Sequence, residues 1–141
     1  MIDERTQFQI YYPPFESAIE AEVGSFMCSY NLINTVWACE NNQTLNTDLR
    51  ERMGFKGYVM SDWGATHSLA VDKGMDQEMN FDFHNRFYNA HKLKEFPEEV
   101  DQSNIRMFTQ FFKIGSFDQV PDSNRNMSAN VTTGERKEKA K

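Results

Sequence analysis

The apolar positions near the amino terminus change from helical to strand spacing. Pro13 and Pro14 interrupt a helical pattern over residues 5–20, where they kink the helix or start a new one. Gly24 then opens a short apolar run over residues 25–30, which has the length of a strand. The apolar stripe of the helix is expected to be buried. It consists of Phe8, Tyr11, Tyr12, Phe15 and Ile19.

A second helix and a second strand come next. Leu45, Leu49 and Met53 recur every fourth residue, which is the spacing of one face of a helix. Gly54 follows at once and can end this helix in a left-handed cap. The apolar residues 58–61 then form the second strand, so the pattern so far reads helix, strand, helix, strand.

The alternation continues more weakly after this strand. Residues 66–73 can form a short helix capped by its first residue, a threonine, and residues 75–79 give a third, weaker strand. Strands that alternate with helices predict an α/β fold with parallel strands, whose ligands bind beyond the carboxyl ends of the strands. Tyr30, Asp62 and Glu78 are expected near that edge.

The pattern of the following residues is less regular. Residues 80–98 predict an irregular loop with at most one helix. Asp101 or Ser103 can then cap a helix that Gly115 ends. The apolar stripe of this helix is expected to be buried. It consists of Ile105, Phe108, Phe111 and Phe112.

Composition narrows the class of function. The 141 residues have a formal net charge of -6, and 39% of them are hydrophobic, which suits one acidic globular domain. Neither a basic stripe for nucleic acid nor an apolar run long enough for a membrane is present, and the amino terminus lacks the pattern of a signal peptide. The domain is expected over residues 1–120, and the polar, charged residues 121–141 are expected to be a tail or an interdomain linker.

The two cysteines leave two interpretations open. Cys28 and Cys39 lack the paired spacing of a zinc site or a redox motif, so no metal and no other cofactor is expected. They are either a buried thiol and a thiol in the polar loop of residues 31–42, or a short-loop disulfide formed in an oxidising compartment. Three glycosylation sequons also favour an extracellular or vesicular origin. They begin at Asn42, Asn126 and Asn130.

The candidate chemistry lies where the second strand ends, at Asp62 and Trp63. A carboxylate can stabilise or attack an oxocarbenium-like carbon, and a flat indole can pack against a sugar ring. By itself, an aspartate that closes a strand is more often a turn former or a helix cap. The residues around this turn therefore decide how it is interpreted.

Three longer segments surround the turn. They are Val23–Asn31 (VGSFMCSYN), Ala38–Asn41 (ACEN) and Leu49–Ala65 (LRERMGFKGYVMSDWGA). In this order and spacing they resemble family 3 glycoside hydrolases of the β-glucosidase type. Residues 74–79 and 107–118 also resemble segments of that family. The resemblance covers most of residues 3–140 and is weakest over residues 80–98.

The resemblance implies a partial (β/α)8 TIM-like barrel, roughly its last three strand–helix units. It implies that Asp62 is the nucleophile of a retaining glycosidase that acts on terminal β-D-glucosides. It also implies that Trp63, Tyr30 and Met27 line the subsite for the terminal sugar, although an indole can equally pack at the barrel edge and a strand methionine is more often packing. The two cysteines resemble a pair that is bridged in secreted members.

The sequence also departs from the family pattern. Thr35 stands where many members carry glycine, and Asn80 stands where a proline commonly follows, so the local loop geometry is expected to differ. A larger departure is that the first half of the barrel, and a second domain with the acid/base glutamate, are expected to lie outside these residues. Three strands cannot close an eight-stranded barrel.

Residues within the chain are weaker candidates for the missing acid. Glu78 is the best placed, at a predicted strand end, but a solvated or ion-paired role is the stronger expectation. Glu40, in the long loop, is a weaker candidate. His67 is expected to cap a helix or to face solvent.

Two functions therefore remain open. The first is a β-glucosidase-like hydrolase, of which this chain is a part that does not hydrolyse aryl β-glucosides alone, because it offers a nucleophile without its proton donor. The second is an inactive remnant, or a fragment that binds carbohydrate or protein through exposed strand edges.

Overall fold

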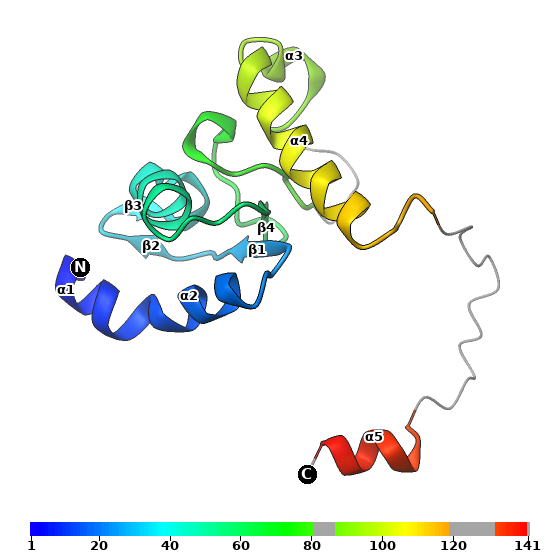
Figure 1. The fold of residues 1–141 in the computed structure, drawn as a ribbon. Helices are drawn as coiled ribbons and strands as arrows, with labels where there is room; N and C mark the ends of the chain where they lie inside the picture. The colour runs from blue at the N-terminus through cyan, green and yellow to red at the C-terminus, as the bar shows by residue number, and fades with distance from the viewer. Residues whose placement is uncertain (81–86, 119–131, 141) are drawn as a thin grey trace.

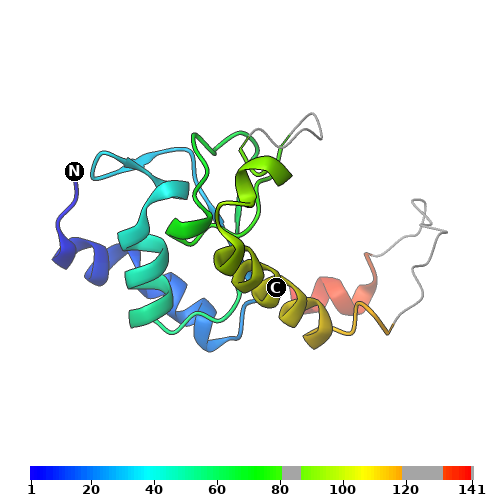
Figure 2. The same cartoon turned by 90° about the horizontal axis from the view of Figure 1, so that it is seen from above.

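Helices flank a small parallel sheet, as Figure 1 shows. The computed structural model describes residues 1–80, 87–118 and 132–140. Seen from above in Figure 2, helix η3 (Gln43–Arg52) lies between the amino-terminal helices and helix α4 (Pro97–Lys113). The described part of the chain is therefore a mixed α/β structure.

The central sheet consists of β1 (Ser25–Cys28) and β4 (Tyr58–Ser61), which run parallel. Phe26 lies opposite Val59, and the two strands end level with each other at Cys28 and Ser61. Both predicted strands and their parallel pairing are confirmed. The crossover between them brings two strand ends that lie 33 residues apart in the sequence, Cys28 and Ser61, to one edge.

The third predicted strand, over residues 75–79, is reduced to a single parallel bridge between Met60 and Gln77. The N–H groups of Asp76 and Gln77 both donate to the carbonyl of Val59, at 2.9 and 3.1 Å. Two residues that share one partner interrupt the ladder in the manner of a bulge. A regular third strand is therefore not formed, although the segment lies beside β4 as expected.

Three short helical segments precede the sheet. They are α1 (Glu4–Thr6), the more widely wound η1 (Gln7–Tyr11) and α2 (Pro13–Glu20). The prolines start a new helix, since Pro13 occupies its first turn, where a missing N–H costs no hydrogen bond. The expected buried stripe holds only in part: Tyr12 is buried and Ile19 packs against the core, whereas Tyr11 and Phe15 are exposed.

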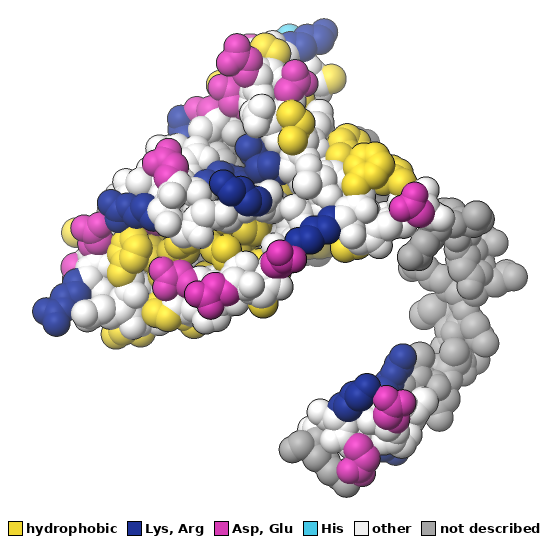
Figure 3. Space-filling view, in the orientation of Figure 1, with side chains coloured by type: hydrophobic (Ala, Val, Ile, Leu, Met, Phe, Trp, Pro, Cys, Tyr) yellow, Lys and Arg dark blue, Asp and Glu magenta, His cyan; other side chains and the backbone are white. Residues whose placement is uncertain are grey.

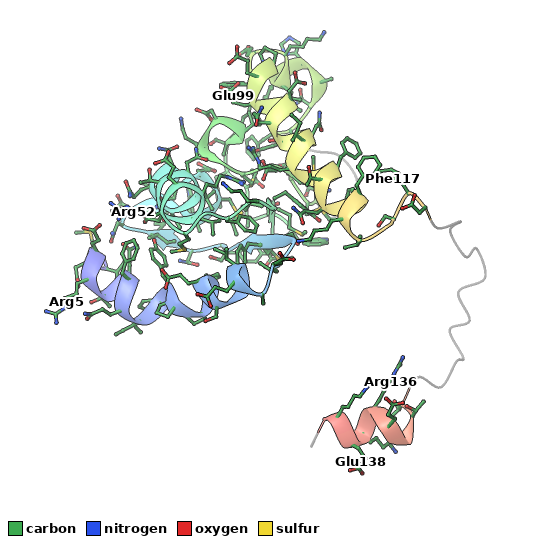
Figure 4. The ribbon with its side chains drawn as sticks, in the orientation of Figure 1. Arg5, Arg52, Glu99, Phe117, Arg136 and Glu138 are labelled. Atoms are coloured by element: carbon green, nitrogen blue, oxygen red, sulfur yellow. A yellow bond between two sulfur atoms is a disulfide. The ribbon has the colours of Figure 1, made fainter. Side chains whose placement is uncertain are left out.

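The attachment of these helices explains that outcome. The Tyr12 hydroxyl donates to the buried carboxylate of Asp48 in η3 at 2.9 Å. Arg52 of η3, labelled in Figure 4, also reaches the carboxylate of Glu4 at 2.7 Å. The helices are thus held by polar contacts along one side, and their other aromatic side chains are left outside the described core.

A β-hairpin occupies the segment that was predicted to be a polar loop. It consists of β2 (Leu32–Ile33) and β3 (Val36–Trp37), which pair antiparallel, and η2 (Ala38–Glu40) follows it. Its two turn residues, Asn34 and Thr35, have φ values of 48° and 75°. Such a pair is typical of the two-residue turn that matches the twist of a hairpin. Strands of two residues are too short to show alternation in a sequence.

The helix predicted around Leu45, Leu49 and Met53 is confirmed as η3. Gly54 follows it with a φ of 76°, as predicted for a left-handed cap. Leu45 and Leu49 are buried against Val59 of the sheet. This helix was predictable because the spacing of its apolar residues and the glycine that follows them indicate the same helix end.

The helix predicted over residues 66–73 was wrong. Most of this segment is irregular, and only η4 (Val71–Lys73) forms a short turn, which Gly74 ends at a φ of 101°. The expected cap is not made, because the buried hydroxyl of Thr66 has no hydrogen-bond partner among the described residues.

Helices α3 (Ala90–Leu93) and α4 cover the last part of the described core. Helix α4 begins at Pro97, so neither Asp101 nor Ser103 caps it, and Ser103 is buried within it. Its apolar stripe is also not buried as expected, since the exposed large hydrophobic side chains include three of its members. They are Ile105, Phe108 and Phe112.

A polar cluster replaces that stripe in attaching α4. The carboxylate of Asp76 accepts from Ser103 at 2.9 Å and pairs with Arg106 at 2.5 Å, both on α4. It also pairs with Arg50 of η3 at 2.7 Å and accepts from the N–H of Val59 at 2.7 Å. The Asp76 side chain is completely buried, so this carboxylate joins two helices to the sheet.

The remaining expectations concern the end of the chain. Helix α5 (Gly134–Lys139) lies in the predicted tail, and its residues are exposed. Residues 81–86 of the predicted irregular loop lie outside the described residues. So do most of residues 121–141, including the sequon asparagines Asn126 and Asn130.

Candidate active site

Asp62 lies directly after β4, at the carboxyl end of the parallel sheet. Its N–H donates to the carbonyl of Cys28 at 3.1 Å, which continues the ladder by one step beyond the strand. Its own carbonyl accepts from the N–H of Ala65 at 3.1 Å, so the chain turns at once. Gly64 allows this turn with a φ of 81°. Asp62 and Trp63 are both half-buried.

Tyr30 reaches the same turn from the segment after β1. Its hydroxyl donates to the carbonyl of Trp63 at 2.6 Å, and 48% of the residue is exposed. Partial desolvation, together with the nearby carboxylate of Asp62, raises the pKa of Tyr30 above its ordinary value. The phenol therefore stays protonated at neutral pH and remains a hydrogen-bond donor beside Asp62.

Met27 lies in β1, level with Met60 of β4, and is 51% exposed. Met60 is two residues before Asp62, so Met27 lies close to the strand ends but has no described polar contact with the turn. The structure thus brings Asp62, Trp63 and Tyr30 together and places Met27 on the neighbouring strand. Their roles toward a sugar stay predictions.

Cys28 and Cys39 form a disulfide in the structure. Both residues are buried, and the bond joins the end of β1 to η2. Of the two interpretations that the sequence left open, the structure has the bridged one. The covalent bond lies one step from the turn, because the carbonyl of Cys28 is the partner of the Asp62 N–H.

Glu78 is not solvated as expected, and it forms no ion pair with another described residue. It is buried, and its carboxylate accepts from the N–H groups of Phe87 and Tyr88, both at 3.0 Å. The hydroxyl of Tyr88 donates to the carbonyl of Met75 at 2.7 Å, and burial raises the pKa of this phenol. Glu78 therefore fixes the start of the segment that leads to α3, and one of its oxygens, Oε2, accepts both bonds.

Glu40 and His67 contact each other. The Glu40 carboxylate accepts from the N–H of His67 at 2.7 Å. The His67 ring stacks on Trp37 with centroids 3.8 Å apart and planes within 1° of parallel. His67 is exposed, as one of the two expectations held, but it caps no helix.

Asp76 is the important polar residue to which the sequence analysis assigned no role. Its partners, Arg50 and Arg106, lie 26 and 30 residues away along the chain, on two different helices. No local spacing indicates such a cluster. Its burial and its four polar partners indicate a role in holding the fold together rather than in chemistry.

Two further features bear on what the site can hold. Among residues 1–80, 87–118 and 132–140, no group of His, Cys, Asp and Glu has the arrangement of a metal site. A cavity of about 520 Å³ is lined mainly by apolar residues of the amino-terminal helices, β1 and η3, and Met27 is one of them. Asp62, Trp63 and Tyr30 do not line it. No described helix is long and apolar enough to cross a membrane.

Comparisons with curated proteins give consistent relatives. The chain is 37% identical over 126 residues to "Probable beta-glucosidase A" of Aspergillus clavatus, a match that covers 81% of this chain and 14% of the relative. It is 38% identical over 138 residues to "Probable beta-glucosidase G" of Emericella nidulans, covering 85% of this chain and 17% of that protein. The chain thus spans about a sixth of the length of these relatives.

Solved structures give the same result. The β-D-glucoside glucohydrolase of Trichoderma reesei superimposes with a TM-score of 0.83 and 35% identity, over 96% of this chain and 20% of that one. DesR, a β-glucosidase of Streptomyces venezuelae solved with D-glucose, has a TM-score of 0.78 and 33% identity, over 86% of this chain and 18% of its own.

A family model completes the comparison. The N-terminal domain of glycosyl hydrolase family 3 matches residues 1–81, which is more than half of the chain. The matched region includes β1, the hairpin, η3, β4 and the Asp62 turn. The chain belongs to glycoside hydrolase family 3.

Proposed function

We propose that this chain carries the nucleophile of a retaining hydrolase that acts on terminal β-D-glucosides, and that Asp62 is this nucleophile. The observation that carries the proposal is the position of Asp62 at the carboxyl end of β4, with the Tyr30 phenol and the Trp63 indole at the same turn. The relatives named as β-glucosidases support the substrate class.

In the proposed first step, a carboxylate oxygen of Asp62 attacks the anomeric carbon of the glucoside. A bond forms between Asp62 and that carbon while the bond to the leaving oxygen breaks, and a second carboxyl group about 5 Å away gives its proton to the leaving oxygen. The same group then takes a proton from water, which hydrolyses the glycosyl–enzyme bond and restores Asp62. The Trp63 indole packs against the sugar, and Tyr30 holds the backbone of the turn.

The second carboxyl group is proposed to lie outside these 141 residues. The two glutamates considered for the role, Glu78 and Glu40, each accept backbone N–H groups in the structure, which favours a structural role for them. The curated relatives are also several times longer than this chain, which leaves room for a second domain.

The fold and origin of the protein follow from the same proposal. Residues 1–120 are proposed to be the carboxyl-terminal part of a (β/α)8 TIM-like barrel, with residues 121–141 as a tail or linker. The parallel β1–β4 pair with its crossover supports a barrel segment. The disulfide supports an extracellular or vesicular location, because such bonds persist in oxidising compartments.

A mechanism-based inactivator tests the assignment. The protein, expressed at full length, is incubated with 2-deoxy-2-fluoro-β-D-glucosyl fluoride, and the labelled peptide is mapped by mass spectrometry. The label is expected on Asp62. Asp62→Asn should lose the label and at least about 1,000-fold of the turnover.

The exposed Glu98 of α4 provides a matched control, since Glu98→Gln also neutralises one carboxylate but lies away from the turn. This variant should label and turn over as the wild type does. A label on another residue would remove the assignment of Asp62. A folded wild-type protein with neither label nor turnover would instead favour the inactive remnant.

A further inference from the structure

The loop that follows the proposed nucleophile makes few hydrogen bonds of its own. Residues 62–67 form neither helix nor strand. Within the loop, the N–H of Ala65 donates to the carbonyl of Asp62 at 3.1 Å, and Nδ1 of His67 lies 3.0 Å from the carbonyl of Ala65. A loop of this kind takes its conformation from the groups around it, because its remaining polar groups need partners elsewhere.

The segment of residues 30–40 supplies several of those partners, and the carbonyls of Cys28 and Met79 accept the N–H groups of Asp62 and Gly64. Glu40 accepts the backbone N–H of His67 at 2.7 Å, and the Trp37 indole stacks on the His67 ring at 3.8 Å between centroids. The hydroxyl of Tyr30 adds a third contact, to the carbonyl of Trp63. The 30–40 segment thus contacts the loop at both ends, next to the nucleophile and five residues beyond it.

The 30–40 segment is itself fixed to the end of β1. The Cys28–Cys39 disulfide holds its carboxyl end, and the N–H of Ala38 donates to the carbonyl of Asn31 at 3.0 Å across the base of the hairpin. The carbonyl of Cys28 accepts the N–H of Asp62 at 3.1 Å. The end of β1 therefore holds the nucleophile directly and, through the disulfide, the residues that contact the loop after it.

We propose that Trp37 and Glu40 are positioning residues for Asp62 and Trp63, an inference that rests on the proposed function of Asp62. Neither contacts the reacting atoms. Each fixes His67, and His67 fixes the turn through the carbonyl of Ala65. Glu40 acts by a hydrogen bond from a backbone N–H to a carboxylate, and Trp37 acts by the area of its stacked ring.

The proposal predicts a specific kinetic effect. A nucleophile must stand within a few tenths of an ångström of its productive position, and misplacement by about 1 Å can cost about 100-fold in rate. A looser loop should therefore lower the maximal rate of Asp62 labelling. The inactivator concentration that gives half of that rate should change less, because sugar binding uses other contacts as well.

Two pairs of variants of the full-length protein test this prediction. Glu40→Ala removes the acceptor for the His67 N–H, whereas Glu40→Gln keeps an oxygen at the same reach. Trp37→Ala removes the stacked ring, whereas Trp37→Phe keeps a smaller one. For each variant, the rate of labelling by the fluoro-glucosyl fluoride and the hydrogen exchange of the peptide over residues 62–67 are measured. Glu98→Ala is the control.

Both alanine variants are expected to exchange faster over residues 62–67 and to lose about tenfold in maximal labelling rate. Glu40→Gln should stay within about twofold of the wild type, and Trp37→Phe should lie between the wild type and Trp37→Ala. Alanine variants with wild-type exchange or labelling would overturn the proposal, as would equal losses in Glu40→Ala and Glu40→Gln. A wild-type protein labelled away from Asp62 would refute the proposed function, and the exchange data alone would then test the contact of the 30–40 segment with the loop.

Discussion

The Asp62 turn and the two flanking helices, α2 and α4, are attached to the sheet in different ways. The turn is held by a hydrogen bond from the N–H of Asp62 to the end of β1 and by the hydroxyl of Tyr30, and the Cys28–Cys39 disulfide lies nearby. The flanking helices are attached through the buried carboxylates Asp48 and Asp76 and a few apolar contacts, while much of their aromatic surface remains exposed. In Figure 3, hydrophobic side chains gather near the carboxyl end of α4.

The difference shows that the number of aromatic side chains on a helix does not indicate how firmly that helix is bound to the sheet in this chain. Exposed side chains of α4 such as Phe108 and Phe112 lose little water by folding here, so they contribute little to stability. A buried carboxylate with several donors contributes much more, because removing it leaves those donors without a partner. Substitutions at the carboxylates should therefore have larger effects than substitutions of the exposed aromatic residues.

Replacing Asp76 should have the largest effect on stability and therefore tests this comparison most directly. Asp76→Ala leaves two largely buried guanidinium groups, those of Arg50 and Arg106, without their carboxylate. We expect a loss of about 3–5 kcal/mol in the free energy of unfolding, measured by urea denaturation. Asp72→Ala is the matched control. Among the described residues Asp72 forms an ion pair with the neighbouring, exposed Lys73, so this substitution should cost less than about 1 kcal/mol. Equal effects in the two variants would contradict the role of Asp76.

Tyr12 tests the attachment of α2 in the same way, with a smaller expected effect. Tyr12→Phe removes only the hydroxyl that donates to Asp48, which should cost about 1 kcal/mol. Tyr11→Phe is the control, because its neighbouring hydroxyl lies on a residue that is 57% exposed. A loss of stability in Tyr11→Phe as large as that in Tyr12→Phe would show that the buried hydrogen bond is not what holds this helix.

The pH dependence of Tyr12 sharpens that test. Burial, with the Asp48 carboxylate as a second cause, raises the pKa of Tyr12 from its ordinary 10.0 to about 12. The folded protein therefore keeps this proton more tightly than the unfolded chain, so the stabilisation is complete below pH 10 and is lost as the pH rises toward 12. Urea denaturation across this window should show a steeper loss of stability in the wild type than in Tyr12→Phe. Parallel curves would contradict the raised pKa.

Local patterns predicted the parts of the fold that depend on neighbouring residues. The spacing of Leu45, Leu49 and Met53 with Gly54 predicted η3 and its cap, and the apolar run before Asp62 predicted β4. In both cases the apolar period and the terminating residue are adjacent in the sequence. The position of Asp62 at a strand end was predictable for the same reason.

The missed features depend on residues that are distant in the sequence. Asp76 obtains its partners from helices 26 and 30 residues away, and no spacing rule connects them. The apolar stripe of α4 has helical period, but period alone does not reveal what covers a face, and the described residues leave Phe108 exposed. The contact between Glu40 and His67 was missed because the two residues lie 27 positions apart in the sequence, in segments that were expected to be a loop and a helix.

The smallest expected change in stability is that of a substitution at Thr35, which lies within the 30–40 segment. A β-branched residue is strained at a φ of 75°, where glycine is not, so Thr35→Gly should stabilise the protein by about 0.5–1 kcal/mol even though glycine adds entropy to the unfolded chain. The same substitution at the exposed helical position Thr109 should destabilise it by a few tenths of a kcal/mol, about the difference in their helix propensities. Urea denaturation measures both. A loss of stability in both variants would show that the contacts of the hairpin, rather than its backbone geometry, decide the effect of residue 35, and that the segment beside the Asp62 turn stores no strain.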